Sequence, residues 1–167
     1  MKRCALYCLC VLSATTASAQ TGSPIEGVWK VAEWRMPAAN PGASGTSVTP
    51  AEPGLVIFTR GYYSQVVVRG EQPRIAPAPP KDQQNLTDAE KIALYEHWRP
   101  VIVNSGTYEV RGSTVTIRVI VAKNVQVISK APPVELTFKL DGPDTLWLIP
   151  PPQIASREPQ TRYTRLE

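Results

Sequence analysis

The sequence predicts an all-β fold: a single antiparallel up-and-down β-barrel of about eight strands with one short α-helix. Two observations carry this prediction. Apolar and polar residues alternate over most of the chain after residue 26, which is typical of strands with one buried face. In addition, the first strand-like run holds Trp29 and the last holds Arg165, and barrel closure would make these two runs neighbours, so that the guanidinium covers the indole.

The first 19 residues have the pattern of a secretory signal peptide. Lys2 and Arg3 precede an apolar run of roughly 8 residues, and a small-residue site ends at Ala19. The apolar run is much shorter than the ~20 residues that a membrane-spanning helix needs. We therefore expect cleavage after Ala19, a periplasmic or secreted protein without a membrane span, a flexible N-terminus at 20–25 and a barrel domain at 26–167.

Removal of this segment changes the chemistry of the chain. Cys4, Cys8 and Cys10 all lie within it, so no disulfide is expected in the mature protein. Loss of Lys2 and Arg3 lowers the formal net charge from +4 to about +2. The remaining basic residues are scattered singly, and nucleic-acid binding, which needs a cluster of them, is not expected.

The N-terminal half reads as strands broken by two Pro-rich segments. A strand over 26–36 would place Trp29, Val31 and Glu33 on one face and Trp34 on the other. Residues 37–53, rich in Pro, Gly, Ala and Ser, are expected to form a long loop that roofs the barrel mouth. Residues 55–59 and 62–69 form a hairpin around a short Gly turn, and 70–84 form a proline-rich connector outside the sheet.

One helix is expected after this connector. The run Thr87-Asp88-Ala89-Glu90 is a capping box, and the helix should end near Trp98, because Pro100 cannot continue it. We expect its apolar residues to pack against the barrel or to plug one end. These residues are Ile92, Tyr95 and Trp98.

The C-terminal half continues the meander. Residues 106–110 and 113–122 form a second hairpin in which Val115, Ile117, Val119 and Val121 share a face. Further strands are expected at 125–128, 134–140, 145–149 and 161–166, with a tight turn at 141–144.

Several short blocks resemble the bacterial lipocalin-like domain family. They are Gly27-x-Trp29 in the first strand, FTRGYYS at 58–64, TDAE at 87–90, SGTYEV at 105–110, AKN at 122–124 and TRLE at 164–167. The resemblance covers nearly the whole chain after the signal peptide. It implies a small antiparallel barrel with an apolar interior, and it implies no defined reaction.

The residue inventory argues against most catalytic and metal chemistry. Once the cysteines are removed, His97 is the one remaining imidazole or thiol side chain, so no metal site, cofactor or catalytic residue is predicted. Glu33, if it shares the face of Trp29, should either pair with an arginine such as Arg165 or have a raised pKa.

These observations favour an exported protein that binds or sequesters a small apolar molecule inside the barrel. The alternatives are a barrel enzyme of the isomerase or cyclase type, which would use a Glu33–Tyr108 pair, and an envelope interaction module, which would use the Pro-rich segments. An open cavity and a filled core both remain compatible with the sequence. The predicted interior ligand-binding residues are Trp29, Val31, Glu33, Tyr108, Ile117, Val119, Phe138, Tyr163 and Arg165.

Overall fold

The structure is a computed structural model that describes residues 22–37, 45–50, 52–129, 132–156 and 158–167. The predicted signal peptide at 1–19 lies outside these residues, as do 38–44 and 51 of the predicted loop. No helix in the described ranges is long and apolar enough to cross a bilayer.

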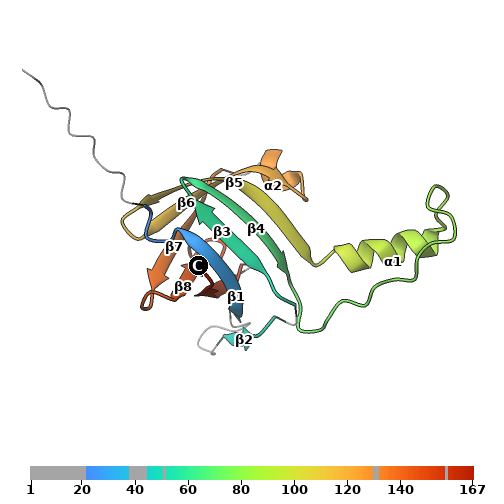
Figure 1. The fold of residues 1–167 in the computed structure, drawn as a ribbon, viewed down its shortest axis with the longest axis horizontal. Coiled ribbons are helices and arrows are strands. Elements are labelled where there is room, and N and C mark those ends of the chain that lie inside the picture. Colours follow the sequence, from blue (N-terminus) through green and yellow to red (C-terminus); the bar gives the residue numbers. More distant parts are fainter. Residues whose placement is uncertain (1–21, 38–44, 51, 130–131, 157) are drawn as a thin grey trace, which may run out of the picture.

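Eight antiparallel strands close into a barrel, as predicted (Figure 1). Each strand pairs with the next along the chain, and the last pairs back with the first. A short additional strand, β2 (Thr46–Val48), pairs with the end of β1 and interrupts the predicted loop. The barrel strands are β1 (Gly27–Met36), β3 (Leu55–Thr59), β4 (Tyr62–Val68), β5 (Val101–Arg111), β6 (Thr114–Ala122), β7 (Val134–Leu140), β8 (Thr145–Ile149) and β9 (Gln160–Arg165).

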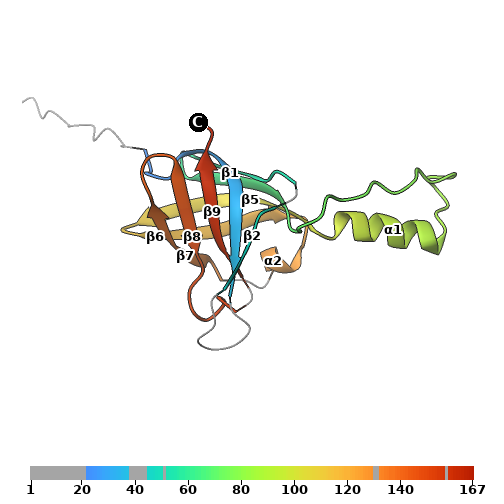
Figure 2. The same cartoon turned by 90° about the horizontal axis from the view of Figure 1, so that it is seen from below.

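Strands β1 and β9 lie side by side and close the barrel (Figure 2). This pairing brings Trp29 and Arg165 together. The two residues are direct cross-strand partners, and the guanidinium carbon lies 4.1 Å from the indole centroid, which confirms the predicted contact. Arg165 Nη1 also donates a 2.7 Å hydrogen bond to the Glu26 carbonyl. The cation therefore covers one end of the core while its Nε and Nη1 donate to the Pro143 and Glu26 carbonyls.

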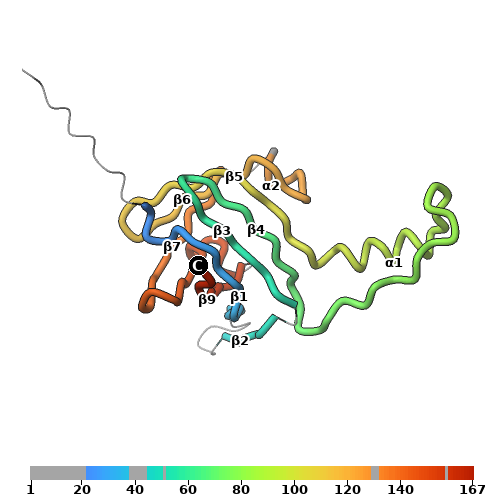
Figure 3. The backbone as a smooth tube through the Cα atoms, viewed as in Figure 1, coloured from blue at the N-terminus to red at the C-terminus, as the bar shows by residue number. Residues whose placement is uncertain are grey.

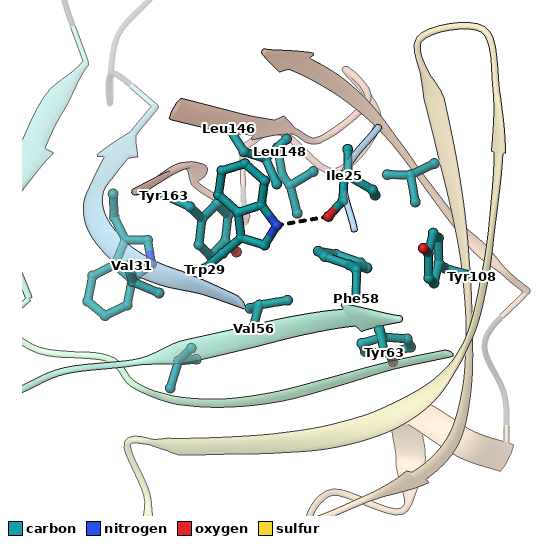
Figure 4. Packing of buried hydrophobic residues seen from close by; sticks show 13 residues of the cluster. Ile25, Trp29, Val31, Val56, Phe58, Tyr63, Tyr108, Leu146, Leu148 and Tyr163 are labelled. Carbon is teal, nitrogen blue, oxygen red and sulfur yellow. Dashed lines mark hydrogen bonds between the residues drawn. The ribbon is translucent and has the colours of Figure 1, made fainter. Parts of the chain in front are cut away.

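The packed chain begins slightly earlier than predicted. Trp29 Nε1 donates a 2.8 Å hydrogen bond to the carbonyl of Ile25, and both side chains are fully buried (Figure 4). Ile25 therefore belongs to the core and not to a flexible N-terminus. Burial of its side chain removes apolar surface from water at the same end of the barrel that Arg165 covers.

The barrel has two unlike ends. At one end, which we call the closed end, short turns join β3 to β4, β5 to β6 and β7 to β8. In the first of these turns Arg60 and Gly61 have positive φ values of 46° and 82°, the combination that a two-residue hairpin turn requires. At the other end, the mouth, long connections leave β4, β6 and β8.

A β-bulge in β1 reverses part of the predicted face assignment. The register with β9 shifts between Val31 and Glu33, so one extra residue enters the strand and the alternation slips. As a result Trp34, not Glu33, follows Trp29 and Val31 into the interior, where it is 6% exposed. The prediction that Glu33 lies on the inner face is therefore wrong.

The helix forms as predicted, but it does not pack on the barrel. Helix α1 (Asp88–Trp98) has both hydrogen bonds of the capping box at Thr87, yet none of its residues is buried. Ile92, Tyr95 and Trp98 are 62%, 63% and 53% exposed. The chain runs out from β4, returns through α1 and enters β5, forming an arm over 70–99 that projects from the mouth (Figure 3).

One predicted strand is a helix. Residues 126–129 form the single-turn helix α2 (Gln126–Ser129), where the sequence pattern indicated a strand at 125–128. The Asn124 side chain accepts a hydrogen bond from the Gln126 amide at 3.1 Å. This cap satisfies a first-turn donor and favours the helical turn over an extended strand.

Candidate ligand-binding cavity

A cavity of about 440 Å³ occupies the half of the barrel nearer the mouth. Its volume lies within the usual range of small-molecule sites, roughly 300–1,000 Å³. Every barrel strand contributes to its wall, because each strand points alternate side chains inward. Its apolar lining includes Trp34, Val56, Phe58, Tyr63, Val67, Ile102, Ile117, Val119, Leu136, Leu148 and Tyr163.

The floor of the cavity is the packed core of the closed end. Phe58 contacts Tyr63 and lies edge-on to Tyr108, with ring centroids 5.0 Å apart in the second pair. Trp29 and Ile25 lie in the same cluster (Figure 4). Large aromatic side chains therefore fill the closed half, and the smaller residues of β5, β6 and β7 leave space in the other half.

Two side-chain amides lie among the apolar residues that line the cavity. Gln65 on β4 and Asn104 on β5 are direct cross-strand partners, and both line the cavity. Their side chains are partly buried and make no hydrogen bond to any described residue. Because direct partners across a sheet lie about 5 Å apart on one face, the two amides form a pair.

The rim carries one ion pair. Arg69 Nη2 lies 2.6 Å from the Glu158 carboxylate, and both side chains are nearly half exposed. Both residues line the cavity, so the cavity reaches solvent where they lie. The two opposite charges compensate each other, and the pair joins the β4 end to the loop before β9.

The cavity tyrosines are held neutral. Burial raises the pKa of Tyr63 to about 12 and the pKa of Tyr163 to about 12. The Tyr63 hydroxyl is buried and has no hydrogen-bond partner in the described part of the chain. Tyr63 can therefore act only as a neutral hydrogen-bonding group.

The structure divides the predicted interior residues into four groups. Ile117, Val119 and Tyr163 line the cavity. Trp29, Val31, Tyr108 and Phe138 belong to the packed core or its margin. Arg165 covers the closed end, and Glu33 lies outside the barrel.

The hydrogen-bond partners of Glu33 explain the direction of its pKa shift. Its carboxylate accepts a hydrogen bond from the Ser47 hydroxyl at 2.7 Å and one from Arg162 Nε at 2.9 Å. These bonds hold the pKa of Glu33 below its usual value, which is opposite to the raised value expected of an unpaired interior carboxyl. Its partner is Arg162 and not Arg165, as the shifted register requires.

The two residues of the enzyme hypothesis do not meet. Tyr108 is buried at the floor beside Phe58, and Glu33 faces Arg162 on the outside of the sheet. An acid–base pair has to share one pocket with the substrate. In the described residues no three His, Cys, Asp or Glu side chains gather into a group that could hold a metal ion.

Sequence reasoning missed the polar cavity residues. Gln65 alternates with Tyr63 and Val67 on β4, and this period-two signal places it on the inner face. Asn104 alternates in the same way with Ile102 and Tyr108 on β5, because the extra residue of the β5–β6 register shift lies on β6. Trp34 was missed because a bulge precedes it in β1.

No protein-family model matches the chain, and no curated protein matches it. Among solved structures, a crystal structure of a lipocalin-like protein from Bacteroides uniformis ATCC 8492 is similar to it, with a TM-score of 0.48 and 12% sequence identity. The match covers 86% of this chain and 100% of that chain. Closure of the present barrel rests on its own β1–β9 pairing.

Proposed function

We propose that this protein is an exported member of the bacterial lipocalin-like domain family and that it binds a small apolar molecule in the barrel. The single observation that carries the proposal is the cavity of about 440 Å³ with a mostly apolar wall. Binding of an apolar guest there would be favoured by roughly 25 cal/mol for each Å² of apolar surface removed from water.

The contrast between the two barrel ends supports the same function. Trp29, Phe58 and Arg165 fill and cover the closed end, so a guest would enter and leave through the mouth. At the mouth, the Arg69–Glu158 pair is exposed, and exposed ion pairs cost little to rearrange. A packed floor with a loosely closed mouth suits reversible binding better than permanent enclosure.

Fluorescence titration with N-phenyl-1-naphthylamine, an uncharged apolar dye, tests the proposal. We expect saturable binding with one site per chain. Val119→Trp, which adds a large side chain inside the cavity, should weaken that binding at least ten-fold, because the dye and the indole compete for one volume.

Val121→Trp is the matched control. The prediction that Val121 shares the face of Val119 is wrong, because the register shift between β5 and β6 places one extra residue between them. Val121 is 58% exposed and does not line the cavity. Its substitution should leave dye binding unchanged. Thermal melts would show that both variants fold. Absence of saturable binding in the unmodified protein, or equal loss in both variants, would contradict cavity binding.

Export is the second part of the proposal. It is supported by the signal-peptide pattern at 1–19, which includes the positive residues Lys2 and Arg3 and the small-residue site at Ala19. Mass spectrometry of the protein purified from the envelope fraction should find a chain that begins at Gln20. A chain that retains residues 1–19 in the cytoplasmic fraction would contradict export.

A second candidate function, an envelope interaction module, is favoured by the projecting arm. Tyr95 and Trp98 are each more than half exposed on α1, and aromatic residues of this kind are frequent in protein interfaces. Photo-crosslinking from position 95 in intact cells would test it, with position 111 at the closed end as the control site. Equal crosslinking from both positions would remove the basis for this function.

A further inference from the structure

We propose that the ligand is an uncharged amphiphile, and that the paired amides of Gln65 and Asn104 bind its one polar group, a hydroxyl or a carbonyl. This inference rests on the proposed function and narrows it to a chemical class. The argument uses the charges of the cavity, the position of the amide pair and the hydrogen-bonding capacity of an amide.

The charges of the cavity disfavour an ionised ligand group in its interior. Among the described lining residues, Arg69 and Glu158 are the ionisable groups charged near neutral pH, and they are bound to each other at 2.6 Å. Burial keeps Tyr63 and Tyr163 neutral. A carboxylate, phosphate or ammonium drawn into the interior would lose its hydration with no free opposite charge to replace it.

The amide pair stands part of the way along the cavity. On β4, Tyr63, Gln65, Val67 and Arg69 follow one another from the floor to the rim and all line the cavity. Gln65 is paired across the sheet with Asn104, and Val67 with Ile102. Apolar side chains therefore lie on both sides of the amides, and a bound polar group there would be largely shielded from water.

The amides are free to act on a guest. Neither side chain hydrogen-bonds to another described residue, although each offers a carbonyl acceptor and two N–H donors. The buried Tyr63 hydroxyl, two positions from Gln65, also has no partner within the described residues. An amide can accept from a hydroxyl and donate to a carbonyl, so the preferred guests are neutral alcohols, ketones, esters or amides.

A displacement experiment on the full mature chain tests this class. Bound N-phenyl-1-naphthylamine is displaced with 1-decanol, with 1-chlorodecane and with decanoate at pH 7. The three compounds share a ten-carbon chain and differ in carrying a hydrogen-bonding neutral group, no strong hydrogen-bonding group, or a charge. The proposal expects decanol to displace the dye at a lower concentration than decanoate.

The decisive readout is the effect of Gln65→Leu and Asn104→Leu. Because one hydrogen bond contributes about 1 kcal/mol, each substitution should weaken decanol binding about five-fold while 1-chlorodecane binds as well as before or better. Gln72→Leu, an exposed amide in the arm that does not line the cavity, is the control and should change neither compound.

The possible outcomes distinguish failure of the proposed ligand class from failure of the proposed ligand-binding function. Saturable dye binding, together with equal effects of the amide substitutions on decanol and 1-chlorodecane, would overturn the ligand class and leave cavity binding intact. Tighter binding of decanoate than of decanol, lost in Arg69→Gln, would overturn it in favour of an anion site at the rim. Absence of any saturable dye binding would overturn both proposals.

Discussion

At the scale of single residues, the Trp29 side chain contacts both the segment before β1 and the last strand, β9. Its indole is fully buried, its Nε1 binds the Ile25 carbonyl and its ring lies under the Arg165 guanidinium. The sequence pattern could predict the contact with Arg165, because both residues sit in the terminal strands of a closing barrel. The hydrogen bond to Ile25 could not be predicted, because it depends on how the chain turns before β1.

Trp29→Ala should lower the free energy of unfolding by roughly 3–5 kcal/mol, as expected when a large buried side chain is truncated. The measurement is urea-induced unfolding followed by circular dichroism. Trp98→Ala, in the exposed arm, is the matched control and should change the free energy of unfolding little. An unchanged unfolding midpoint in Trp29→Ala would contradict the inward placement of this residue.

The outward placement of Glu33 predicts the sign of a pH effect. Its folded-state pKa lies below the ordinary value of 4.5, so its ionised form stabilises the fold above pH 4.5 and this stabilisation is lost as the pH falls below that value. In Glu33→Gln the free energy of unfolding should therefore fall less steeply below pH 4.5 than in the unmodified protein.

Chemical unfolding at a series of pH values between 3 and 7 measures this slope, within about 0.5 kcal/mol between variants. Glu109→Gln, which removes an exposed carboxyl on β5, is the control for the loss of one surface charge. If Glu33 were an interior carboxyl with a raised pKa, the sign would be opposite: its contribution to stability would be lost as the pH rises.

At the scale of elements, local sequence signals predicted the strands and helix α1 more accurately than they predicted how helix α1 packs. The capping box at Thr87 is a local interaction, and it forms as the sequence indicates. Packing of α1 on the barrel is not local, and the prediction of it was wrong, because apolar residues at helical spacing do not specify a partner surface. The bulge between Val31 and Glu33 shows a second limit, since one extra residue reverses every later face assignment in the strand.

The arm is bounded by two adjacent strand ends, so its removal should be tolerated by the barrel. Val68 pairs with Val101, and the Arg69 amide donates to the Pro100 carbonyl at 3.0 Å. Replacement of 70–99 by a short Gly-rich turn should leave the barrel folded and dye binding within about two-fold of the full chain, because no residue of α1 is buried.

The deletion also removes the bidentate contact of Arg74 with Glu52 and the contacts of Lys123 with the carbonyl groups of Trp98 and Arg99. The Lys123 hydrogen bonds are exposed, whereas the Arg74 and Glu52 side chains are 23% and 22% exposed, so the Arg74–Glu52 contact is the larger loss on deletion. Thermal melting and dye titration of the shortened chain are the measurements. A shortened chain that fails to fold would show that the arm stabilises the barrel.

At the scale of the whole molecule, the strand pattern predicted the barrel, and no local signal predicted its cavity. Alternation over β3 to β9 and the Trp29–Arg165 contact define a sheet that closes. Whether the interior is filled depends on the summed volume of inward side chains from strands that are far apart in the sequence. Here aromatic residues fill the closed end, while Ile117, Val119 and Leu136 leave the mouth end unfilled.

Trp34 reports directly on the central claim, because it is the one tryptophan among the described residues that lines the cavity. In a Trp98→Phe, Trp147→Phe background, only Trp29 at the closed end and Trp34 remain. Titration with 11-bromo-1-undecanol, whose bromine quenches indole fluorescence on contact, is the measurement. The account predicts saturable quenching that disappears when Trp34 is also replaced by Phe. Absence of saturable quenching, or quenching that persists without Trp34, would contradict a ligand-binding cavity in the barrel.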